Sequence, residues 1–188
     1  AAQRIVKGGK EYVVDIDLSK FFDRVHHDRL ISRLAQHIPD KRILRVIGMT
    51  LRSGVMKDGL YSPTVEGTVQ GGPLSPLLSN VVLDELDKEL ERRGLEFCRF
   101  ADDCNIFVSS QKAAQRVMDS ISKFISNKLK LMVNQEKSKV ALSKYVKFLG
   151  LTIIAGTIAI STVSMNRAMA KVKELTPRGT HLKLEETI

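Results

Sequence analysis

Asp102 and Asp103 form the pair of residues in this sequence with the clearest chemical potential. They lie between two apolar segments, residues 95–100 and 104–108, whose pattern predicts a β-hairpin with an acidic tip. Two adjacent carboxylates repel each other, and a bound cation removes that unfavourable energy. Oxygen ligands favour a hard ion such as Mg²⁺ over Zn²⁺. Taken alone, residues 100–103 are more typical of an ordinary Asp-Asp turn, so the rest of the chain has to decide.

A third carboxylate comes from the first predicted strand. Residues 12–18 alternate so that the apolar side chains share one face and Asp15 and Asp17 share the other. If this strand lies beside the hairpin, Asp17 faces Asp102 and Asp103. Three carboxylates from separate strands can hold two Mg²⁺ ions about 3.5–4 Å apart, the spacing used for nucleotidyl transfer. A set of unrelated surface acids at strand ends is the alternative.

The chain is basic overall. Its 188 residues include 30 Lys and Arg against 21 Asp and Glu, giving a net charge of +9. Such a balance suits a polyanionic partner. The excess is concentrated between Lys112 and Lys147, where Asp119 and Glu136 are the only acidic residues. A solvated helix face explains the charge of this stretch equally well.

Other features of the composition exclude some classes of protein. No apolar run is long enough to span a membrane, and no signal peptide opens the sequence. Cys98 and Cys104 flank the acidic tip, and opposite arms of a hairpin could bring them together. Two cysteines do not make a disulfide framework, and no Cys/His spacing typical of a metal site is present. We therefore expect reduced core cysteines in a cytoplasmic protein.

The apolar pattern predicts an α+β domain. An irregular hairpin is expected over residues 53–68, and a tight loop over residues 70–76 leads into a helix. Strands are expected at residues 12–18, 95–100, 104–108, 140–142, 145–154 and 157–160, and helices at residues 28–37, 41–51, 77–90, 113–129 and 165–175. Antiparallel strands with helices packed on one face, in a βαββαβ order of ferredoxin type, accommodate these elements.

Several motifs sharpen this prediction. They are DIDLSKFFDRVHHD at residues 15–28, GTVQGGPLSPLLSN at 67–80 continuing to LDELD at 83–87, FADD at 100–103, NQEKSK at 134–139 and FLG at 148–150. Together they make the chain resemble the reverse transcriptase domain of group II intron-encoded proteins, the intron maturases, from about residue 12 to about residue 176. The resemblance implies a reverse transcriptase palm with a ferredoxin-like core and partial fingers.

The resemblance implies roles for residues of the first motif. Asp17 is expected to bind metal together with the two hairpin carboxylates, and Leu18 to offer a backbone carbonyl to a metal. Phe22, five residues after Asp17, is expected to stack under the deoxyribose and to clash with a 2′-hydroxyl; its alternative is a core aromatic. Asp15 lies two residues before Asp17 on the same face of the strand, and its role stays open.

Later motifs supply the nucleotide pocket. Gln70 and Gly71 are expected to line it, since glycine lets the backbone approach base and sugar. Lys137 is expected near the leaving pyrophosphate as a proton donor, with Lys139 as its rival. Residues 148–150 resemble the segment that grips the primer. The sequence departs from the family pattern at Phe100, where Tyr is common, and at Val69, where Pro is common; neither change removes a group that the chemistry needs.

The resemblance also implies a division of the chain. Residues 1–163 are expected to form the palm with partial fingers, including a fingers insertion at about residues 38–68, and residues 164–188 the start of a thumb or linker. Because the family's remaining fingers motifs and thumb helices fall outside residues 1–188, we expect the chain alone to be weakly active or inactive. The expected cofactor is a pair of Mg²⁺ ions, with Mn²⁺ able to substitute.

The main hypothesis is an RNA-directed DNA polymerase domain of a group II intron maturase. Its expected partners are an RNA template, intron RNA, a DNA primer or target and deoxynucleoside triphosphates, with no membrane. A retron or CRISPR-associated type of bacterial reverse transcriptase is the second hypothesis; the segment from residue 70 to residue 87 favours the intron type. A non-catalytic RNA-binding fragment is the third, and primer extension distinguishes it from the enzymes.

Overall fold

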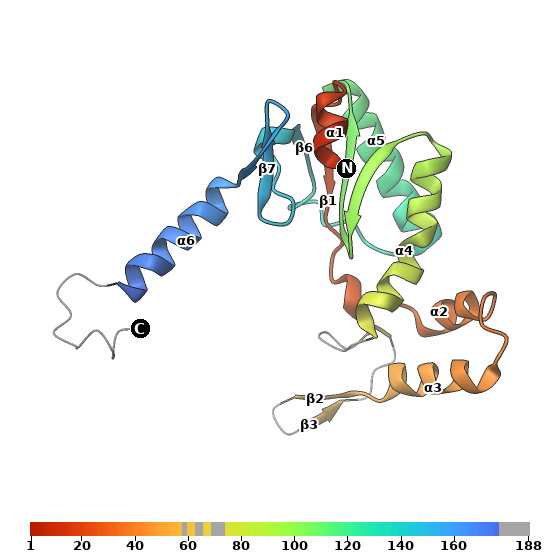
Figure 1. The fold of residues 1–188 in the computed structure, drawn as a ribbon. Helices are drawn as coiled ribbons and strands as arrows, with labels where there is room; N and C mark the ends of the chain where they lie inside the picture. Colours follow the sequence, from red (N-terminus) through yellow and green to blue (C-terminus); the bar gives the residue numbers. More distant parts are fainter. Residues whose placement is uncertain (58–59, 63–65, 69–73, 177–188) are drawn as a thin grey trace.

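The protein is built around a four-stranded antiparallel sheet. The computed structural model describes residues 1–57, 60–62, 66–68 and 74–176. The sheet has the strand order β4–β5–β1–β6 (Figure 1). Its strands are β1 (Tyr12–Ile16), β4 (Glu96–Phe100), β5 (Asp103–Val108) and β6 (Lys139–Leu142). Helices connect β1 to β4 and β5 to β6, so the predicted βαββαβ order is confirmed.

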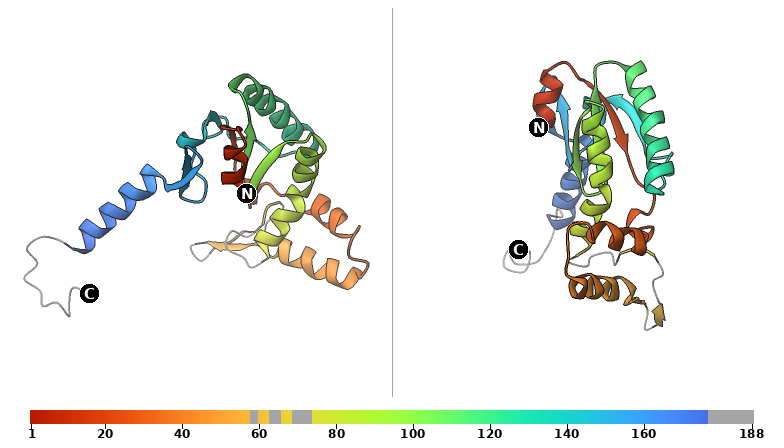
Figure 2. Two further views of the ribbon diagram at one scale, coloured as in Figure 1. Left: turned by 45° about the horizontal axis from the view of Figure 1, so that its top comes forward. Right: turned by 90° about the vertical axis from the view of Figure 1, so that its right-hand side faces the viewer.

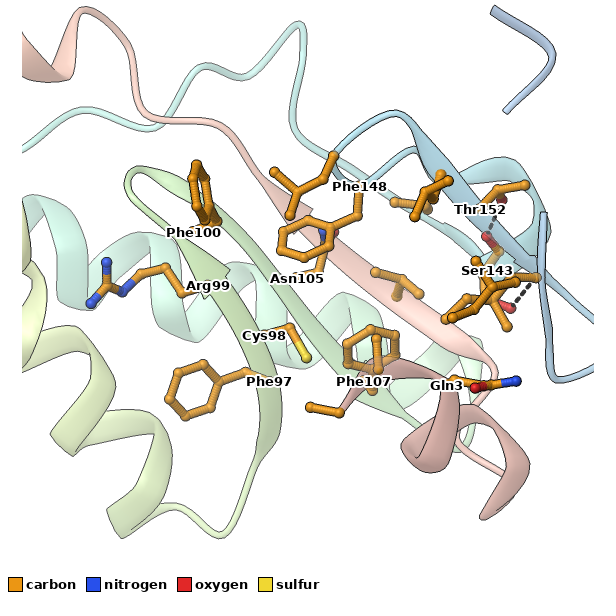
Figure 3. A pocket seen from close by; sticks show the side chains of 18 residues that line it. Gln3, Phe97, Cys98, Arg99, Phe100, Asn105, Phe107, Ser143, Phe148 and Thr152 are labelled. Carbon is orange, nitrogen blue, oxygen red and sulfur yellow. Dashed lines mark hydrogen bonds between the residues drawn. The ribbon is translucent and has the colours of Figure 1, made fainter. Parts of the chain in front are cut away.

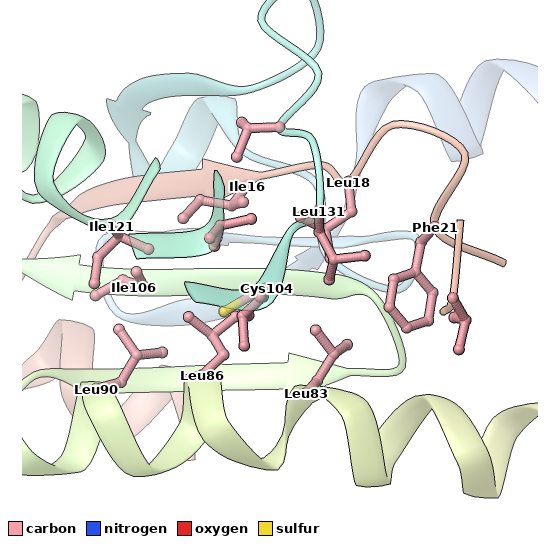
Figure 4. Close-up of a cluster of buried hydrophobic side chains, with 14 of the residues drawn as sticks. Ile16, Leu18, Phe21, Leu83, Leu86, Leu90, Cys104, Ile106, Ile121 and Leu131 are labelled. Atoms are coloured by element: carbon pink, nitrogen blue, oxygen red, sulfur yellow. The ribbon is translucent and has the colours of Figure 1, made fainter. Parts of the chain in front are cut away.

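Two long helices cover one face of this sheet. They are α4 (Ser75–Arg92) and α5 (Gln111–Phe124), which continues into a π-helical turn at Ile125–Leu129. Leu83, Leu86 and Leu90 recur at helical spacing on α4 and pack on the sheet (Figure 4). The main core therefore lies between the sheet and these two helices, where the sequence predicted it.

The opposite face of the sheet carries a smaller apolar cluster. Here α1 (Ala2–Lys7) packs on the sheet together with Val146, from the segment that precedes β7. The strands β7 (Leu151–Ile154) and β8 (Thr157–Ile160) follow this segment. The cluster contains Ile5, Val6, Val13, Phe107 and Val146. The sequence did not predict α1, which packs on the face opposite α4 and α5. Alanine at its N-cap position offers no side-chain cap, so the sequence lacked the usual signal for a helix start.

The segment between β1 and α4 forms a second region below the sheet (Figures 1 and 2). It contains a 3₁₀ turn (Phe21–Asp23), α2 (His27–Leu34), α3 (Lys41–Arg52) and the small hairpin of β2 (Val55–Lys57) and β3 (Leu60–Ser62). The Asp40 side chain caps α3 by accepting a hydrogen bond from the Arg42 amide at 2.8 Å. The predicted helices and hairpin are thus present, whereas Gln70 and Gly71 lie outside the described residues.

Beyond β6 the structure differs from the predicted long strand over residues 145–154. A 3₁₀ turn covers Ser143–Tyr145, and β7 begins only at Leu151. Leu149 (φ +52°) and Gly150 (φ +82°) form a two-residue turn between Phe148 and Leu151, whose backbones exchange hydrogen bonds of 2.9 and 3.0 Å. Both turn residues have the positive φ that a tight hairpin needs, and this breaks the strand that the apolar pattern predicted.

The last described helix, α6 (Thr162–Leu175), extends away from the sheet as an arm (Figure 1). Ser161 caps it, with its hydroxyl accepting from the Ser164 amide at 3.3 Å. None of its residues is buried. The boundary predicted at residue 164 therefore falls inside the first turn of this helix, and its assignment to a thumb stays a prediction. In the part of the chain that the structure describes, no helix is long and apolar enough to cross a membrane.

Candidate active site

The predicted carboxylates gather at one end of the two central strands. β1 pairs antiparallel with β5, with Ile16 opposite Cys104 and Asp15 opposite Asn105. Asp17 and Asp103 each lie one residue beyond the Ile16–Cys104 pair, at the same end of the two strands. Because side chains alternate along a strand, Asp15, Asp17 and Asp103 share the face opposite α4 and α5.

The pKa shifts of these carboxyl groups reflect both their burial and one another's charges. Partial burial raises the pKa of Asp103, and the negative charges of Asp102 and Asp17 raise it further, whereas Lys147 lowers it. Burial is also the main cause that raises the pKa of Asp15 to about 6, followed by the charge of Asp103. Like charges held together in this way are stabilised by a cation between them.

The donor chemistry of this cluster fits a hard divalent ion. Asp17, Asp102 and Asp103 are half-buried and offer only oxygen atoms, the ligand type that Mg²⁺ prefers. Among the residues that the structure describes, no three His, Cys, Asp or Glu side chains are already spaced as a coordination group. The strands therefore bring the carboxylates into electrostatic contact, while their final convergence requires side-chain adjustment.

The tip of the hairpin is a two-residue turn. Phe100 pairs with Asp103, so Ala101 and Asp102 alone connect β4 to β5. Ala101 has φ +53°, in the left-handed region that costs a residue with a Cβ roughly 1–2 kcal/mol. Phe100, beside this turn, is 62% exposed. A strained turn thus carries Asp102 outward at the end of the sheet.

The backbone around Asp17 is held by a segment that lies more than 100 residues later in the sequence. The Asn134 amide donates to the Asp17 carbonyl at 2.9 Å, and the Ser19 amide donates to the Met132 carbonyl at 2.7 Å. These two bonds form the bridge that sets Leu18 opposite Val133, and neither uses the Leu18 carbonyl. The predicted role of that carbonyl as a metal ligand is thus compatible with the local pairing.

Ser138 completes this attachment of the first strand. Its hydroxyl accepts from the Asp17 amide at 3.0 Å and lies 3.3 Å from the Asp17 carbonyl oxygen. The sequence placed Ser138 in a motif without assigning it a role. Its contact with Asp17 spans 121 residues of sequence and could not be read from local spacing.

The sequence left two alternatives for Phe22, a contact with the sugar or a place in the core. The structure puts the neighbouring Phe21 in the core. Phe21 is buried in the main core, whereas Phe22 is half-buried and meets the Phe21 ring edge-on, with centroids 5.2 Å apart. The Phe22 carbonyl accepts from the Thr68 amide at 2.5 Å. A Cβ on Gly67 would lie 2.8 Å from the same carbonyl oxygen, so this close approach requires glycine.

His27 adds a second attachment between these segments. Its Nε2 lies 2.6 Å from the Gly67 carbonyl oxygen, and the ring is buried. Since a carbonyl only accepts, Nε2 carries the proton in this contact. Residues 66–68 are therefore held against the Phe22 turn, two residues before Gln70 in the sequence.

The structure separates the two candidate proton donors. Lys137 is exposed in a turn in which the Asn134 side chain accepts from the amides of Glu136 and Lys137 at 3.1 and 3.3 Å. Lys139 pairs with Asp15 across β1 and β6, lowers the pKa of Asp15, and places its Nζ 3.4 Å from the Tyr145 carbonyl oxygen. Both lysines are exposed, but Lys139 is engaged at the sheet, which favours Lys137 as the candidate.

The basic stretch from Lys112 to Lys147 does not form one surface. Lys112, Arg116 and Lys123 lie on α5, which covers the face of the sheet opposite the carboxylates. Lys147, in contrast, interacts with Asp103. The sequence missed this pairing because it depends on how the chain after β6 returns to the sheet.

A cavity of about 510 Å³ lies between the β4–β5 hairpin and the segment from Ser143 to Ile153 (Figure 3). Its lining includes Phe100 and Asn105 of the hairpin and Phe148 of the predicted primer-gripping segment. Asn105 is 1% exposed, and both atoms of its amide group are buried without a hydrogen-bond partner among the described residues. None of the three expected metal ligands lines this cavity.

The two cysteines cannot pair across the hairpin. Cys98 lies opposite Asn105, and Cys104 lies opposite Arg99. Because opposed residues share a face and neighbours along a strand do not, the two thiols point to opposite faces of the sheet. Both are free, and Cys104 is buried in the main core, as expected from the sequence.

A βαββαβ sheet with carboxylates at the ends of its central strands is the arrangement expected of a polymerase palm. Residues 3–153 match the family model described as "Reverse transcriptase (RNA-dependent DNA polymerase)". The chain therefore belongs to the reverse transcriptase family. This match confirms the resemblance that the motifs indicated.

Individual relatives agree with the family match. The group II intron-encoded protein LtrA of Lactococcus lactis is 33% identical over 135 residues, covering 72% of this chain and 22% of LtrA. Protein YkfC of Escherichia coli is 29% identical over 163 residues, covering 69% of this chain and 43% of YkfC. The chain thus spans less than half the length of either relative. LtrA is a group II intron-encoded protein, the type that the motifs indicated.

A solved structure supports the fold independently. Apo telomerase from Candida tropicalis superposes with a TM-score of 0.67 at 17% identity, covering 93% of this chain and 38% of that one. At this identity the similarity concerns the fold alone.

We expect replacement of Asn105 by leucine to stabilise the fold. A buried amide without partners costs roughly 1–3 kcal/mol, and leucine of similar volume removes that cost. Asn105→Leu should therefore raise the free energy of unfolding by about 1–2 kcal/mol in urea denaturation followed by circular dichroism. Asn134→Leu is the matched control: it removes two satisfied hydrogen bonds and should lower that free energy. Destabilisation by Asn105→Leu would show that the amide has a partner.

Proposed function

We propose that this chain is the palm, with part of the fingers, of an RNA-directed DNA polymerase of the group II intron-encoded type. The reaction would be nucleotidyl transfer from a deoxynucleoside triphosphate to a primer 3′-hydroxyl. The observation that carries the proposal is the electrostatic contact of Asp17 with Asp103 at the ends of adjacent strands. Membership of the reverse transcriptase family supports it.

Asp17, Asp102, Asp103 and the Leu18 carbonyl would hold two Mg²⁺ ions, with Mn²⁺ able to replace them. Bound there, the ions would supply activation of the hydroxyl and neutralisation of charge on the phosphates. The surrounding residues orient the carboxylates: Ser138 and Asn134 hold the Asp17 backbone, and the short turn presents Asp102.

The remaining residues would select and position the nucleotide. Phe22, which is half-buried, would lie under the sugar and would clash with a 2′-hydroxyl. Gln70 and Gly71 would line the pocket for the base and sugar. Lys137 would donate a proton to the leaving pyrophosphate, because Lys139 is engaged by Asp15 and Tyr145.

The proposed partners are an RNA template, intron RNA and a DNA primer or target. Lys147 beside Asp103 supports contact with phosphates on this face. A cytoplasmic location is part of the same proposal and agrees with the free thiols of Cys98 and Cys104.

Neutralising one hairpin carboxylate tests the polymerase proposal. In the complete protein, Asp102→Asn or Asp103→Asn should lower primer extension on an RNA template by more than about 10³-fold, because a carboxylate ligand is lost. Asp28→Asn, which removes an exposed carboxylate on α2, is the control and should retain activity. Undiminished extension by the Asp103 variant would overturn the assignment. RNA binding without extension by the unaltered protein would instead support the non-catalytic alternative.

A change of side-chain bulk tests the role of Phe22. Phe22→Val and Phe22→Ala should raise the incorporation of ribonucleotides relative to deoxyribonucleotides by about 10-fold or more, since the space that the ring fills becomes available. Single-nucleotide incorporation with matched rNTP and dNTP measures the ratio. Phe22→Tyr keeps the ring and should keep the discrimination; an unchanged ratio in both small variants would remove Phe22 from this role.

The position of the basic residues predicts a difference between the two faces. Lys147→Gln should flatten the slope of log affinity for an RNA–DNA hybrid against log salt concentration by about 0.7–0.9, because one phosphate contact is lost. Lys123→Gln, on α5 behind the sheet, should leave the slope unchanged. Fluorescence anisotropy over a salt titration measures both. Equal effects of the two substitutions would contradict binding on the carboxylate face.

A further inference from the structure

Arg99 makes an unusual set of contacts behind the catalytic hairpin. Its Nε and one terminal nitrogen donate to the two carboxylate oxygens of Asp87 at 2.7 and 2.5 Å. The other terminal nitrogen donates to the Asn80 side-chain oxygen at 2.8 Å and to the Ala101 carbonyl at 2.7 Å. One guanidinium group thus joins α4 to the turn that carries Asp102.

The sequence explains why these groups meet. Asn80 and Asp87 are seven residues apart on α4, two turns of helix, and so lie on the same side of it. Arg99 lies opposite Cys104 and therefore points toward the core face of the sheet, where α4 packs. Arg99 also belongs to the lining of the cavity in Figure 3. Asp87, the last residue of the LDELD segment at residues 83–87, therefore has Arg99 as its partner.

The burial of this pair distinguishes it from ion pairs along the helix surfaces. The Arg99 side chain is 10% exposed and that of Asp87 is 24% exposed, whereas the Lys88–Asp84 pair on the same helix is 66% and 52% exposed. A bidentate contact of arginine with a carboxylate fixes direction as well as distance. The contact with Asp87 therefore fixes the orientation in which the Arg99 guanidinium meets the turn.

The contact with the turn acts on the peptide unit that precedes Asp102. The Ala101 carbonyl belongs to the planar group linking Ala101 to Asp102, so fixing this oxygen limits rotation of the whole plane. Ala101 also adopts the unfavourable left-handed conformation. A strained turn persists only where its surroundings hold it, and the Arg99 hydrogen bond is such a restraint.

We propose that Arg99, held by Asp87 and Asn80, is a positioning residue that sets the orientation of the metal-binding turn relative to α4. This inference rests on the proposed function, because the purpose of the orientation is to direct Asp102 toward the reacting groups. Within the part of the chain that the structure describes, the Arg99 side chain bonds to the Ala101 carbonyl and not to the carboxylates of Asp102 or Asp103, so it acts through that carbonyl.

The test uses Arg99→Gln and Arg99→Lys in the complete protein. Arg99→Gln should lower kcat for primer extension by about 10²-fold, the effect of a misplacement near 1 Å, with little change in the KM for deoxynucleotide. The Mg²⁺ concentration at half-maximal rate should rise. Arg99→Lys keeps the charge but cannot bridge the same acceptors, so it should not restore kcat.

A double substitution tests whether the residues act as a unit. Asp87→Asn should lower kcat in the same way, and Arg99→Gln with Asp87→Asn should lower it no further than the more affected single variant. Arg93→Gln is the matched control, because it breaks the Arg93–Glu89 ion pair at the far end of α4. It should leave kcat and the Mg²⁺ dependence unchanged.

Hydrogen exchange supplies a readout that does not depend on catalysis. The amides of residues 102–104 should exchange faster in Arg99→Gln than in the unaltered protein, and not in Arg93→Gln. Unchanged exchange at these amides, restoration by lysine, or an equal loss of kcat in Arg93→Gln would each overturn the inference. If Asp103→Asn leaves extension intact, the proposed function fails, while the exchange result still decides whether Arg99 holds the turn.

Discussion

Repulsion among carboxylates at the ends of two neighbouring strands is the constraint on which the rest of this structure depends. Asp17 and Asp103 are brought together by backbone pairing of β1 with β5, and the pKa of Asp103 is raised by burial and by the charges of Asp102 and Asp17. A flexible chain would separate such groups. The sheet prevents this, because its pairing continues through the main core and α4 and α5 support it from behind.

The alternation of side chains along the strands divides the sheet into a structural and a chemical face. On one face Ile16, Cys104 and Ile106 pack against the leucines of α4. On the other, Asp15 and Asn105 lie opposite each other and lead to the carboxylate cluster. A shift of register by one residue would exchange the faces. The apolar residues that stabilise the fold thereby also fix which side chains lie on the face with the carboxylates.

Local pattern predicted the parts of this arrangement that depend on short spacing. The hairpin around Asp102 and the strand carrying Asp17 follow from alternation, and α4 follows from its leucine spacing. The predicted strand over residues 145–154 was wrong because Leu149 adopts a positive φ. This conformation is uncommon for leucine and could not be predicted from the residue type. The link from Ser138 to Asp17 spans 121 residues, and no periodicity reports contacts of that separation. The family motifs identified such residues as a group without explaining what each one touches.

Two unfavourable local features lie in the same hairpin as the expected chemistry. Ala101 is strained, and the Asn105 amide is buried without partners among the described residues. Sequences selected for stability alone would replace both, for example with glycine and leucine. The apolar core on the other face, including Cys104 and Ile106 of the same strand, offsets these costs. Residues of β5 thus alternate between stabilising the protein and serving the surface where the carboxylates meet, which is the distribution expected where function opposes local stability.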